Sequence, residues 1–217
     1  MEYRSAEESH TARYLWPLVL SLLPKGRVFD LGAGNGAFVA RLRAEGFDAS
    51  GADPSESGVA IAKAAGLRVE VGSGDGDLAM RFGRFQAVTC LEVIEHCHYP
   101  RKVARCIHDL LEPGGLAVIS TPYHGYWKNL ALALTNKMDA HFTALWDGGH
   151  VKFWSERTLA LLLTEAGLNV EHVLRVGRIP PLAKSMVAVV RKARRDDVPE
   201  SGSKALPGRP TSRSAGS

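Results

Sequence analysis

The sequence predicts an α/β fold in which a seven-stranded, mostly parallel sheet carries helices on both faces. Strand-like and helix-like patterns alternate along most of the 217 residues, as they do when parallel strands are joined by crossover helices. Short apolar runs that end in glycine, proline or acidic residues supply the strands. A hydrophobic content of 45% in a chain of this length is enough for a full core.

The first half of the chain supplies four strands and three helices. We predict strands at Arg27–Leu31, Asp48–Ala52, Leu67–Val71 and Phe85–Leu91. The predicted helices are Ala6–Leu23, Gly36–Glu45 and Ser57–Ala65. Because proline lacks the backbone N–H that a helix interior needs, we expect the first helix to be interrupted near Pro17.

The second half completes the sheet around a long insert. The predicted elements are a helix at Arg101–Leu111, a strand at Leu116–Ser120, a helix at Ser155–Ala166, and strands at about Asn169–Gly177 and Ser185–Arg191. The turn Pro113-Gly114-Gly115 precedes the fifth strand. The insert, residues 123–151, is rich in apolar and aromatic residues. It is either a helix pair packed on the sheet edge, a lid over an apolar substrate, or an amphipathic element at a membrane interface.

Charge divides the chain into two regions. Residues 1–190 contain 20 basic and 20 acidic residues, whereas residues 191–217 contain 7 basic and 3 acidic ones. The second region is also rich in proline, glycine and serine, and such a segment cannot bury enough apolar surface to fold. We therefore predict one folded domain over 1–190 and a basic, disordered tail over 191–217. The neutral folded part argues against a nucleic-acid partner.

Three features predict a cytoplasmic protein. No run approaches 18 apolar residues, the length of a membrane-spanning helix. The N-terminal residues are polar and acidic, unlike a secretory signal. The cysteines, Cys90, Cys97 and Cys106, are odd in number and lack C-x-x-C spacing, as expected of reduced thiols.

A glycine-rich loop after the first strand predicts a nucleoside-binding site. Asp30 ends the apolar run, and Gly32, Gly34 and Gly36 follow at spacings of two. Glycines let the backbone approach a ligand where a Cβ would clash. Asp53 ends the next predicted strand, where a carboxylate can bind the two hydroxyls of a ribose.

The spacing distinguishes two cofactors. Dinucleotide sites usually have G-x-G-x-x-G, with the pyrophosphate on a helix N-terminus. Here the spacing is G-x-G-x-G with Asp30 just before it. This acid would repel a pyrophosphate but suits a ligand that carries an amine and a sulfonium. The loop therefore favours S-adenosylmethionine over NAD.

A second block, Cys90–Cys97, places acids and a histidine after the fourth strand. Ligands of open α/β sheets bind at the carboxyl ends of strands. If the block forms a helical turn, Glu92, Glu95 and His96 share one face. Two carboxylates and an imidazole suit a divalent metal such as Mg²⁺, Mn²⁺ or Zn²⁺. Alternatively, His96 orders the loop and the glutamates are solvated.

A further ligand can come from the insert. His150 follows two glycines, and His124 follows the fifth strand, so either side chain could approach the block at 92–96. A loop histidine hydrogen-bonded to backbone is the ordinary alternative for each.

Taken together, five segments resemble the class I S-adenosylmethionine-dependent methyltransferases. They are Asp30–Gly36, Asp53, Cys90–Cys97, Leu111–Gly115 and Glu165–Leu168. The resemblance spans about residues 25–190 and implies a Rossmann-like sheet. It also implies that Asp30, Gly32, Gly34 and Gly36 surround the amino-acid end of the cofactor, that Asp53 binds the ribose, that Asp75 flanks the adenine and that Leu91 lies beside the methionine.

Two subfamilies share the E-V-I-E-H block. It resembles the ubiquinone-biosynthesis O-methyltransferases, which methylate catechol-type polyprenyl rings and can depend on a metal. It also resembles the small-RNA 3′-terminal 2′-O-methyltransferases, in which a histidine of an H-x-K-F-x-W-type segment completes the metal site. The corresponding segment here begins at His150, so the resemblance favours Glu92, Glu95, His96 and His150 as ligands. The neutral folded part and the lack of RNA-binding modules disfavour the RNA subfamily.

We expect metal-assisted O-methylation of a small aromatic or quinol-like hydroxyl compound. Without a metal, His96 or His150 would be the general base. The alternatives are 2′-O-methylation of an RNA 3′ end, metal-free N- or C-methylation of a small molecule, and a cofactor-binding protein without catalysis. An apolar acceptor also leaves open a peripheral membrane contact through residues 125–146.

Overall fold

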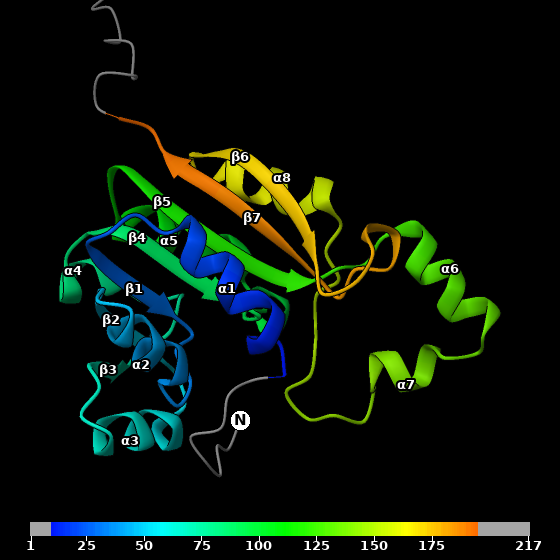
Figure 1. Cartoon of the computed structure of the whole chain (residues 1–217), viewed down its shortest axis with the longest axis horizontal. Coiled ribbons are helices and arrows are strands. Elements are labelled where there is room, and N and C mark those ends of the chain that lie inside the picture. Colours follow the sequence, from blue (N-terminus) through cyan, green and yellow to red (C-terminus); the bar gives the residue numbers. More distant parts are fainter. Residues whose placement is uncertain (1–9, 195–217) are drawn as a thin grey trace, which may run out of the picture.

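A computed structural model describes residues 10–194 and shows one seven-stranded sheet (Figure 1). The strand order is β3-β2-β1-β4-β5-β7-β6. All neighbouring pairs are parallel except those of β7, which runs antiparallel to both β5 and β6. The predicted fold class, a mostly parallel seven-stranded α/β sheet, is confirmed.

The strands are β1 (Arg27–Leu31), β2 (Asp48–Asp53), β3 (Val69–Val71), β4 (Phe85–Leu91), β5 (Leu111–Pro122), β6 (Leu168–Val176) and β7 (Ser185–Lys192). The α-helices are α1 (Ala12–Leu22), α2 (Ala37–Ala44), α3 (Glu56–Ala64), α4 (Leu78–Phe82), α5 (Pro100–Leu110), α6 (Tyr126–Leu134), α7 (Met138–Phe142) and α8 (Glu156–Glu165). Two short 3₁₀ helices are η1 (Ile94–His96) and η2 (Pro180–Leu182).

Alternating strand residues build two cores, one on each face of the sheet. One core joins Phe29 and Ile119 to apolar residues of α4, α5 and α8. The other joins Val28 and Val118 to α1, α2 and α3. Successive side chains of a strand point to opposite faces, so each central strand contributes to both cores. Helices therefore cover both faces, as predicted.

Four sequence predictions differ from the structure. The first helix is not interrupted, because α1 continues through Pro17 while Leu15, Trp16 and Val19 pack in the core. The strand β5 begins at Leu111, five residues before the predicted start. The sequence analysis did not predict α4, a helix of 5 residues, because so short a segment shows no helical period. The predicted tail starts too early, because Arg191 and Lys192 pair with β5 or β6 as the last residues of β7. Residues 6–9 of the predicted first helix and 195–217 of the predicted tail lie outside the described residues.

The insert forms two helices that lie beside the sheet. After β5 the chain enters α6 and α7 and returns to α8, and Figure 1 shows both helices standing apart from the layered body. Neither helix has a buried residue, although α6 contacts η2. Within residues 10–194, no helix has the length and apolar character needed to cross a membrane.

Candidate active site

A cavity of about 720 Å³ opens at the carboxyl ends of β1, β2 and β4. The order of the sheet reverses between β1 and β4, and such a switch point is where α/β sheets bind ligands. Six of the seven predicted cofactor residues line this cavity: Asp30, Gly32, Gly34, Asp53, Asp75 and Leu91. The structure thus brings together residues from three separate strand ends.

The glycine loop is fixed by close contacts. Gly32 has φ +86°, and a Cβ there would lie 2.3 Å from a methyl carbon of Val93. Only glycine therefore lets the loop after β1 pass this close to the end of β4. Gly36 does not line the cavity. With φ +80° it lies against Ala62 and Leu67, so its role in the structure is packing of α2 rather than enclosure of a ligand.

Two buried acids, Asp30 and Asp53, adjoin the glycine loop. The carboxylate of Asp53 accepts hydrogen bonds from the backbone N–H groups of Gly34 and Ser55, both at 2.8 Å. Asp30 accepts a hydrogen bond of 2.6 Å from the Thr89 hydroxyl. Burial and, to a smaller extent, the charge of Asp53 raise the pKa of Asp30 to about 7. Such a site favours a ligand that brings positive charge to these carboxylates.

Several wall residues escaped the sequence analysis. Aromatic rings from three different helices or helix ends line the cavity, namely Trp16, Phe38 and Tyr99. Trp16 and Phe38 pack with ring centroids 5.2 Å apart. Their positions in helical patterns mark them as core residues, and no local signal distinguishes a core aromatic from one that borders a cavity.

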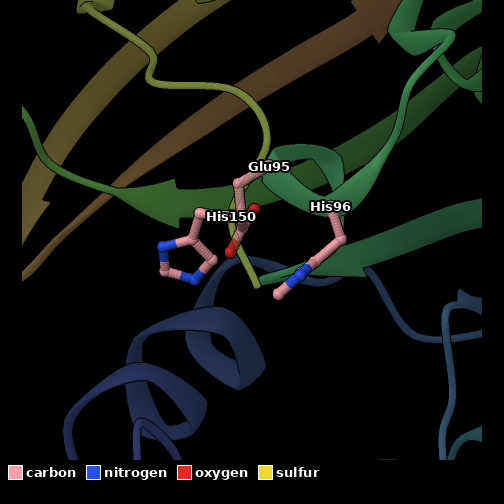
Figure 2. A group of neighbouring side chains, drawn as sticks. All are labelled: Glu95, His96 and His150. Carbon is pink, nitrogen blue, oxygen red and sulfur yellow. The ribbon is translucent and has the colours of Figure 1, made fainter. Parts of the chain in front are cut away.

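Beside this cavity, a carboxylate and two imidazoles converge (Figure 2). Ligand atoms of Glu95, His96 and His150 all lie within 4.8 Å of one another. The rings of His96 and His150 lie 4.8 Å apart, centroid to centroid. His96 also lines the cavity, as does Gly148 of the returning insert. The group therefore adjoins the predicted cofactor site.

Main-chain hydrogen bonds bring His150 to this group. The carbonyl oxygen of Glu95 accepts hydrogen bonds from the N–H groups of Val151 and Lys152, at 2.8 and 2.9 Å. Nδ1 of His96 lies 2.9 Å from the carbonyl oxygen of Gly148. Since a carbonyl oxygen only accepts, Nδ1 carries the proton and Nε2 keeps a lone pair. A histidine that binds a metal through Nε2 needs this tautomer.

Glu95 is the unusual member of the group. Its side chain is only 1% exposed, and neither carboxylate oxygen has a hydrogen-bond partner among the described residues. Burial and then the charge of Glu92 raise the pKa of Glu95 well above its ordinary value, and the nearby backbone N–H of Glu95 and hydroxyl of Thr121 offset this rise only in part. Burial, followed by the charges of His96 and His141, lowers the pKa of His150. An unpaired buried carboxylate is costly, so this group is incomplete without a cation or a proton.

Glu92, the fourth predicted ligand, does not join the group. The predicted helical turn over residues 92–96 contains only η1, and Glu92 precedes it in a left-handed conformation with φ +55°. Its Oε1 accepts a hydrogen bond of 2.8 Å from the Ser120 hydroxyl, and the residue is among those that line the cavity. The left-handed backbone turns Glu92 away from the face shared by Glu95 and His96.

His124, the alternative ligand, lies in a different cluster. Its ring stacks on Phe142 at 5.8 Å and meets His141 and Phe153 edge to face. Burial and the charge of Lys128 lower the pKa of His124 to about 4, so this ring is neutral. His124 therefore connects α7 to the body instead of joining the Glu95 group.

The family follows from a comparison with known protein families. The model of the methyltransferase domain matches residues 4–173, which include β1 to β5 and the whole cavity. The chain belongs to the methyltransferase domain family. It is an S-adenosylmethionine-dependent methyltransferase, and the resemblance noted in the sequence is confirmed.

Curated relatives of this methyltransferase include two bacterial proteins named ubiquinone biosynthesis O-methyltransferase. The protein of Thiobacillus denitrificans is 26% identical over 178 residues, covering 79% of this chain and 77% of the relative. The protein of Aromatoleum aromaticum is 26% identical over 185 residues, covering 82% of this chain and 79% of the relative. The similarity therefore extends over most of both chains.

Solved structures show the same fold. A protein from Pyrococcus horikoshii superposes with a TM-score of 0.66 at 20% identity, covering 88% of this methyltransferase and 94% of that chain. An S-adenosylmethionine-dependent methyltransferase from Mesorhizobium loti superposes with a TM-score of 0.64 at 21% identity. The match covers 87% of this chain and 100% of that one.

The cavity of this methyltransferase has the chemistry that S-adenosylmethionine requires. The carboxylate of Asp30 suits its ammonium and sulfonium groups, Asp53 at the end of β2 suits its ribose hydroxyls, and Asp75 is the residue predicted to flank its adenine. The apolar side chain of Leu91 offers a surface for the methionine carbons. These residue roles remain predictions.

Proposed function

We propose that this methyltransferase O-methylates a small aromatic or quinol-like hydroxyl compound with the help of a divalent metal. The observation that carries the proposal is the buried Glu95, whose oxygens are unpartnered beside two imidazoles. Structural glutamates are paired when buried. A cation between Glu95, His96 and His150 would supply the missing partner.

The residues fit such an ion in donor type and tautomer. One carboxylate with two imidazoles suits Zn²⁺ or Mn²⁺, and the hydrogen bond from His96 Nδ1 to Gly148 leaves Nε2 free. When bound, a divalent metal lowers the pKa of a hydroxyl that binds to it. His96 belongs to both the triad and the cavity wall, so an acceptor at this ion would be next to the methyl donor.

The chain itself positions the reactants and excludes water. Methyl transfer from a sulfonium is an in-line displacement, for which positioning is the main requirement. The cavity holds the donor at the ends of β1, β2 and β4, while residues 148–152 close over η1 through their hydrogen bonds to Glu95 and His96. A water-free acceptor site favours nucleophilic attack by the substrate oxygen over side reactions.

The relatives support the acceptor class. The two bacterial proteins described above are named for O-methylation in ubiquinone biosynthesis. An acceptor of that kind joins a hydroxyl-bearing ring to an apolar chain.

The insert supports a peripheral membrane contact. Its exposed large apolar residues include Tyr126, Trp127, Leu134, Leu145 and Trp146, which we call the insert patch. Ile179, 65% exposed, extends the patch beside η2, and the cations Lys137 and Arg178 flank it. Aromatic rings and cations together are what an anionic bilayer surface binds. We propose that this patch lies on such a surface when the acceptor enters.

A chelation experiment tests the proposed function. The protein is dialysed against EDTA and assayed for S-adenosylhomocysteine formation with an alkylated catechol, before and after Mn²⁺ or Zn²⁺ is restored. We expect turnover to require the ion and to be lost in Glu95→Gln. The matched control is Glu171→Gln, at an exposed glutamate paired with Arg191. Full turnover in EDTA together with an active Glu95→Gln variant would contradict the metal role.

The same assay separates the alternatives. Chelator-resistant methylation of an amine or a carbon acceptor indicates a metal-free enzyme. Protection of RNA 3′ ends from periodate, with binding that weakens steeply as salt rises, indicates a 2′-O-methyltransferase. Cofactor binding without turnover of any acceptor indicates a binding protein.

A further inference from the structure

Trp146, near the end of the insert, lies against both imidazoles of the Glu95 group. Its indole meets the rings of His96 and His150 edge to face, and each pair of centroids is 5.7 Å apart. Favourable aromatic pairs have centroids about 4.5–7 Å apart, so these are true ring contacts. The indole therefore adjoins the side chains at which the proposed function places the acceptor oxygen.

The backbone on both sides of Trp146 holds the indole in this place. The N–H of Trp146 donates to the carbonyl oxygen of Thr143, and the N–H of Gly149 donates to the carbonyl oxygen of Trp146, both at 2.9 Å. A Cβ at Gly149 would lie 2.9 Å from that carbonyl oxygen and 3.3 Å from an indole carbon. Because Gly149 has no Cβ, the ring can lie directly on the backbone of the turn.

The first of these turns begins at a strained residue. Thr143 caps the C-terminus of α7 with φ +45° and ψ +54°, a left-handed conformation that is a genuine outlier for a β-branched residue. Its N–H donates to the carbonyl oxygen of Asp139 at 3.0 Å. Such backbone persists only where the surroundings enforce it, and it gathers at segments that bind ligands. The strained residue thus starts the turn that carries Trp146.

The indole is packed on one part of its surface and open on another. Trp146 remains 47% exposed, although it contacts two imidazoles and the backbone of Gly149. His96 lines the donor cavity, and so does Gly148, two residues after Trp146. Trp146 is thus the member of the insert patch that reaches the cavity wall. A large aromatic surface left open beside a cavity is suited to bind a flat apolar ligand.

We propose that Trp146 binds the aromatic ring of the acceptor and thereby selects ring-bearing hydroxyl compounds. The hydroxyl lies at the Glu95 group, and the ring extends from there onto the open surface of the indole. Aromatic pairs attract each other beyond the burial of their apolar area, so the indole favours a flat ring over an aliphatic alcohol. The inference rests on the proposed O-methylation and identifies the part of the acceptor that the chain recognises.

Binding without turnover tests this role. We measure the affinity for methylcatechol by calorimetry, with Mn²⁺ present and S-adenosylhomocysteine in place of the methyl donor. We expect Trp146→Ala to bind methylcatechol at least about tenfold more weakly and Trp146→Phe to stay within about threefold of the wild type, because phenylalanine keeps a ring. Trp146→Leu, apolar but without a ring, should recover less affinity than Trp146→Phe.

A matched control and a second ligand separate ring binding from support of the imidazoles. Trp127→Ala removes an indole of α6 that is 63% exposed and contacts Tyr126, and it should bind methylcatechol as the wild type does. All variants should keep their Tm and bind Mn²⁺ within about threefold of the wild type. In steady-state assays, Trp146→Ala should raise KM for methylcatechol about tenfold and change kcat less than about threefold.

The outcomes distinguish this inference from the proposed function. Wild-type affinity for methylcatechol in Trp146→Ala overturns the inference alone. A joint loss of methylcatechol and Mn²⁺ binding also overturns it, because the indole then acts only by supporting the imidazoles. So does a wild type that methylates other hydroxyl compounds but binds no methylcatechol. A wild type that methylates no hydroxyl acceptor overturns the proposed function and this inference with it.

Discussion

The imidazole rings of His96 and His150 lie 4.8 Å apart, edge to face, although 53 residues separate them in the chain. Hydrogen bonds from residues 151 and 152 to the Glu95 carbonyl oxygen fix this approach. The returning end of the insert is thereby attached to the turn that follows β4. Any group that binds both imidazoles also links the insert to the sheet.

Replacing His150 tests this link. We expect His150→Ala to weaken Mn²⁺ binding, measured by calorimetry, at least about tenfold, because one of three donors is removed. His172→Ala, at an exposed position on β6, is the matched control and should bind Mn²⁺ as the wild type does. Equal affinities of all three proteins would show that His150 is not a ligand.

The contact between Gly32 and Val93 makes a stability prediction. Both Gly32 and Gly46 have positive φ, +86° and +84°, but a Cβ at Gly46 would meet nothing within 4 Å. Gly46→Ala therefore has only the backbone cost, about 1–2 kcal/mol. Gly32→Ala adds overpacking against Val93. We therefore expect its free energy of unfolding to be about 1–3 kcal/mol lower than that of Gly46→Ala. Urea unfolding measures the stability of both variants, and equal losses of unfolding free energy would contradict the contact between Gly32 and Val93.

The buried carboxyl of Asp30 predicts how stability depends on pH. Its pKa is about 7 in the folded protein, against 3.8 for an ordinary Asp. Between these values the unfolded chain has lost the proton that the folded chain keeps. Asp30 therefore stabilises the fold below about pH 4, and this contribution is lost as pH rises to about 7, by up to about 1.4 kcal/mol per pH unit.

The substitution Asp30→Asn removes this pH-dependent contribution to stability. The amide oxygen of the asparagine can still accept the hydrogen bond from Thr89. We expect the free energy of unfolding of the variant, without cofactor, to decline less steeply between pH 4 and 7 than that of the wild type. Glu92 and Glu95, whose pKa values are also raised, contribute equally to both proteins. If the free energy of unfolding changes with pH equally in both proteins, Asp30 does not titrate in this range.

The insert patch predicts binding to lipid vesicles. Trp127→Ser combined with Leu145→Ser removes two side chains that are 63% and 99% exposed. We expect the double variant to lose cosedimentation with vesicles that contain anionic lipid, while its Tm stays unchanged. Met80→Ser, which alters an 82% exposed residue on α4, should bind as the wild type does. Absence of vesicle binding by the wild type would refute the membrane contact.

Local sequence pattern was sufficient for most of the fold and for placing six of the predicted cofactor residues around one cavity. β1 and β4 begin and end where the apolar runs predict, because a buried parallel strand needs a continuous apolar segment. Asp30, Gly32, Gly34 and Asp53 could be placed together because strand ends meet at one edge of the sheet. Pro17 shows where such reasoning fails, since burial of its neighbours outweighs the helix penalty of proline.

By itself the sequence determined the α/β class, the glycine loop with its two acids, and the acid–histidine block. Only the tertiary structure decided how that block divides. Glu92 has a φ of +55° and its carboxylate is bound by Ser120, while Glu95 and His96 meet His150 from the insert. Sequence spacing fixes which residues are neighbours on a regular element. It cannot fix side-chain direction where the backbone leaves the regular conformations, because contacts from distant strands and loops determine that direction.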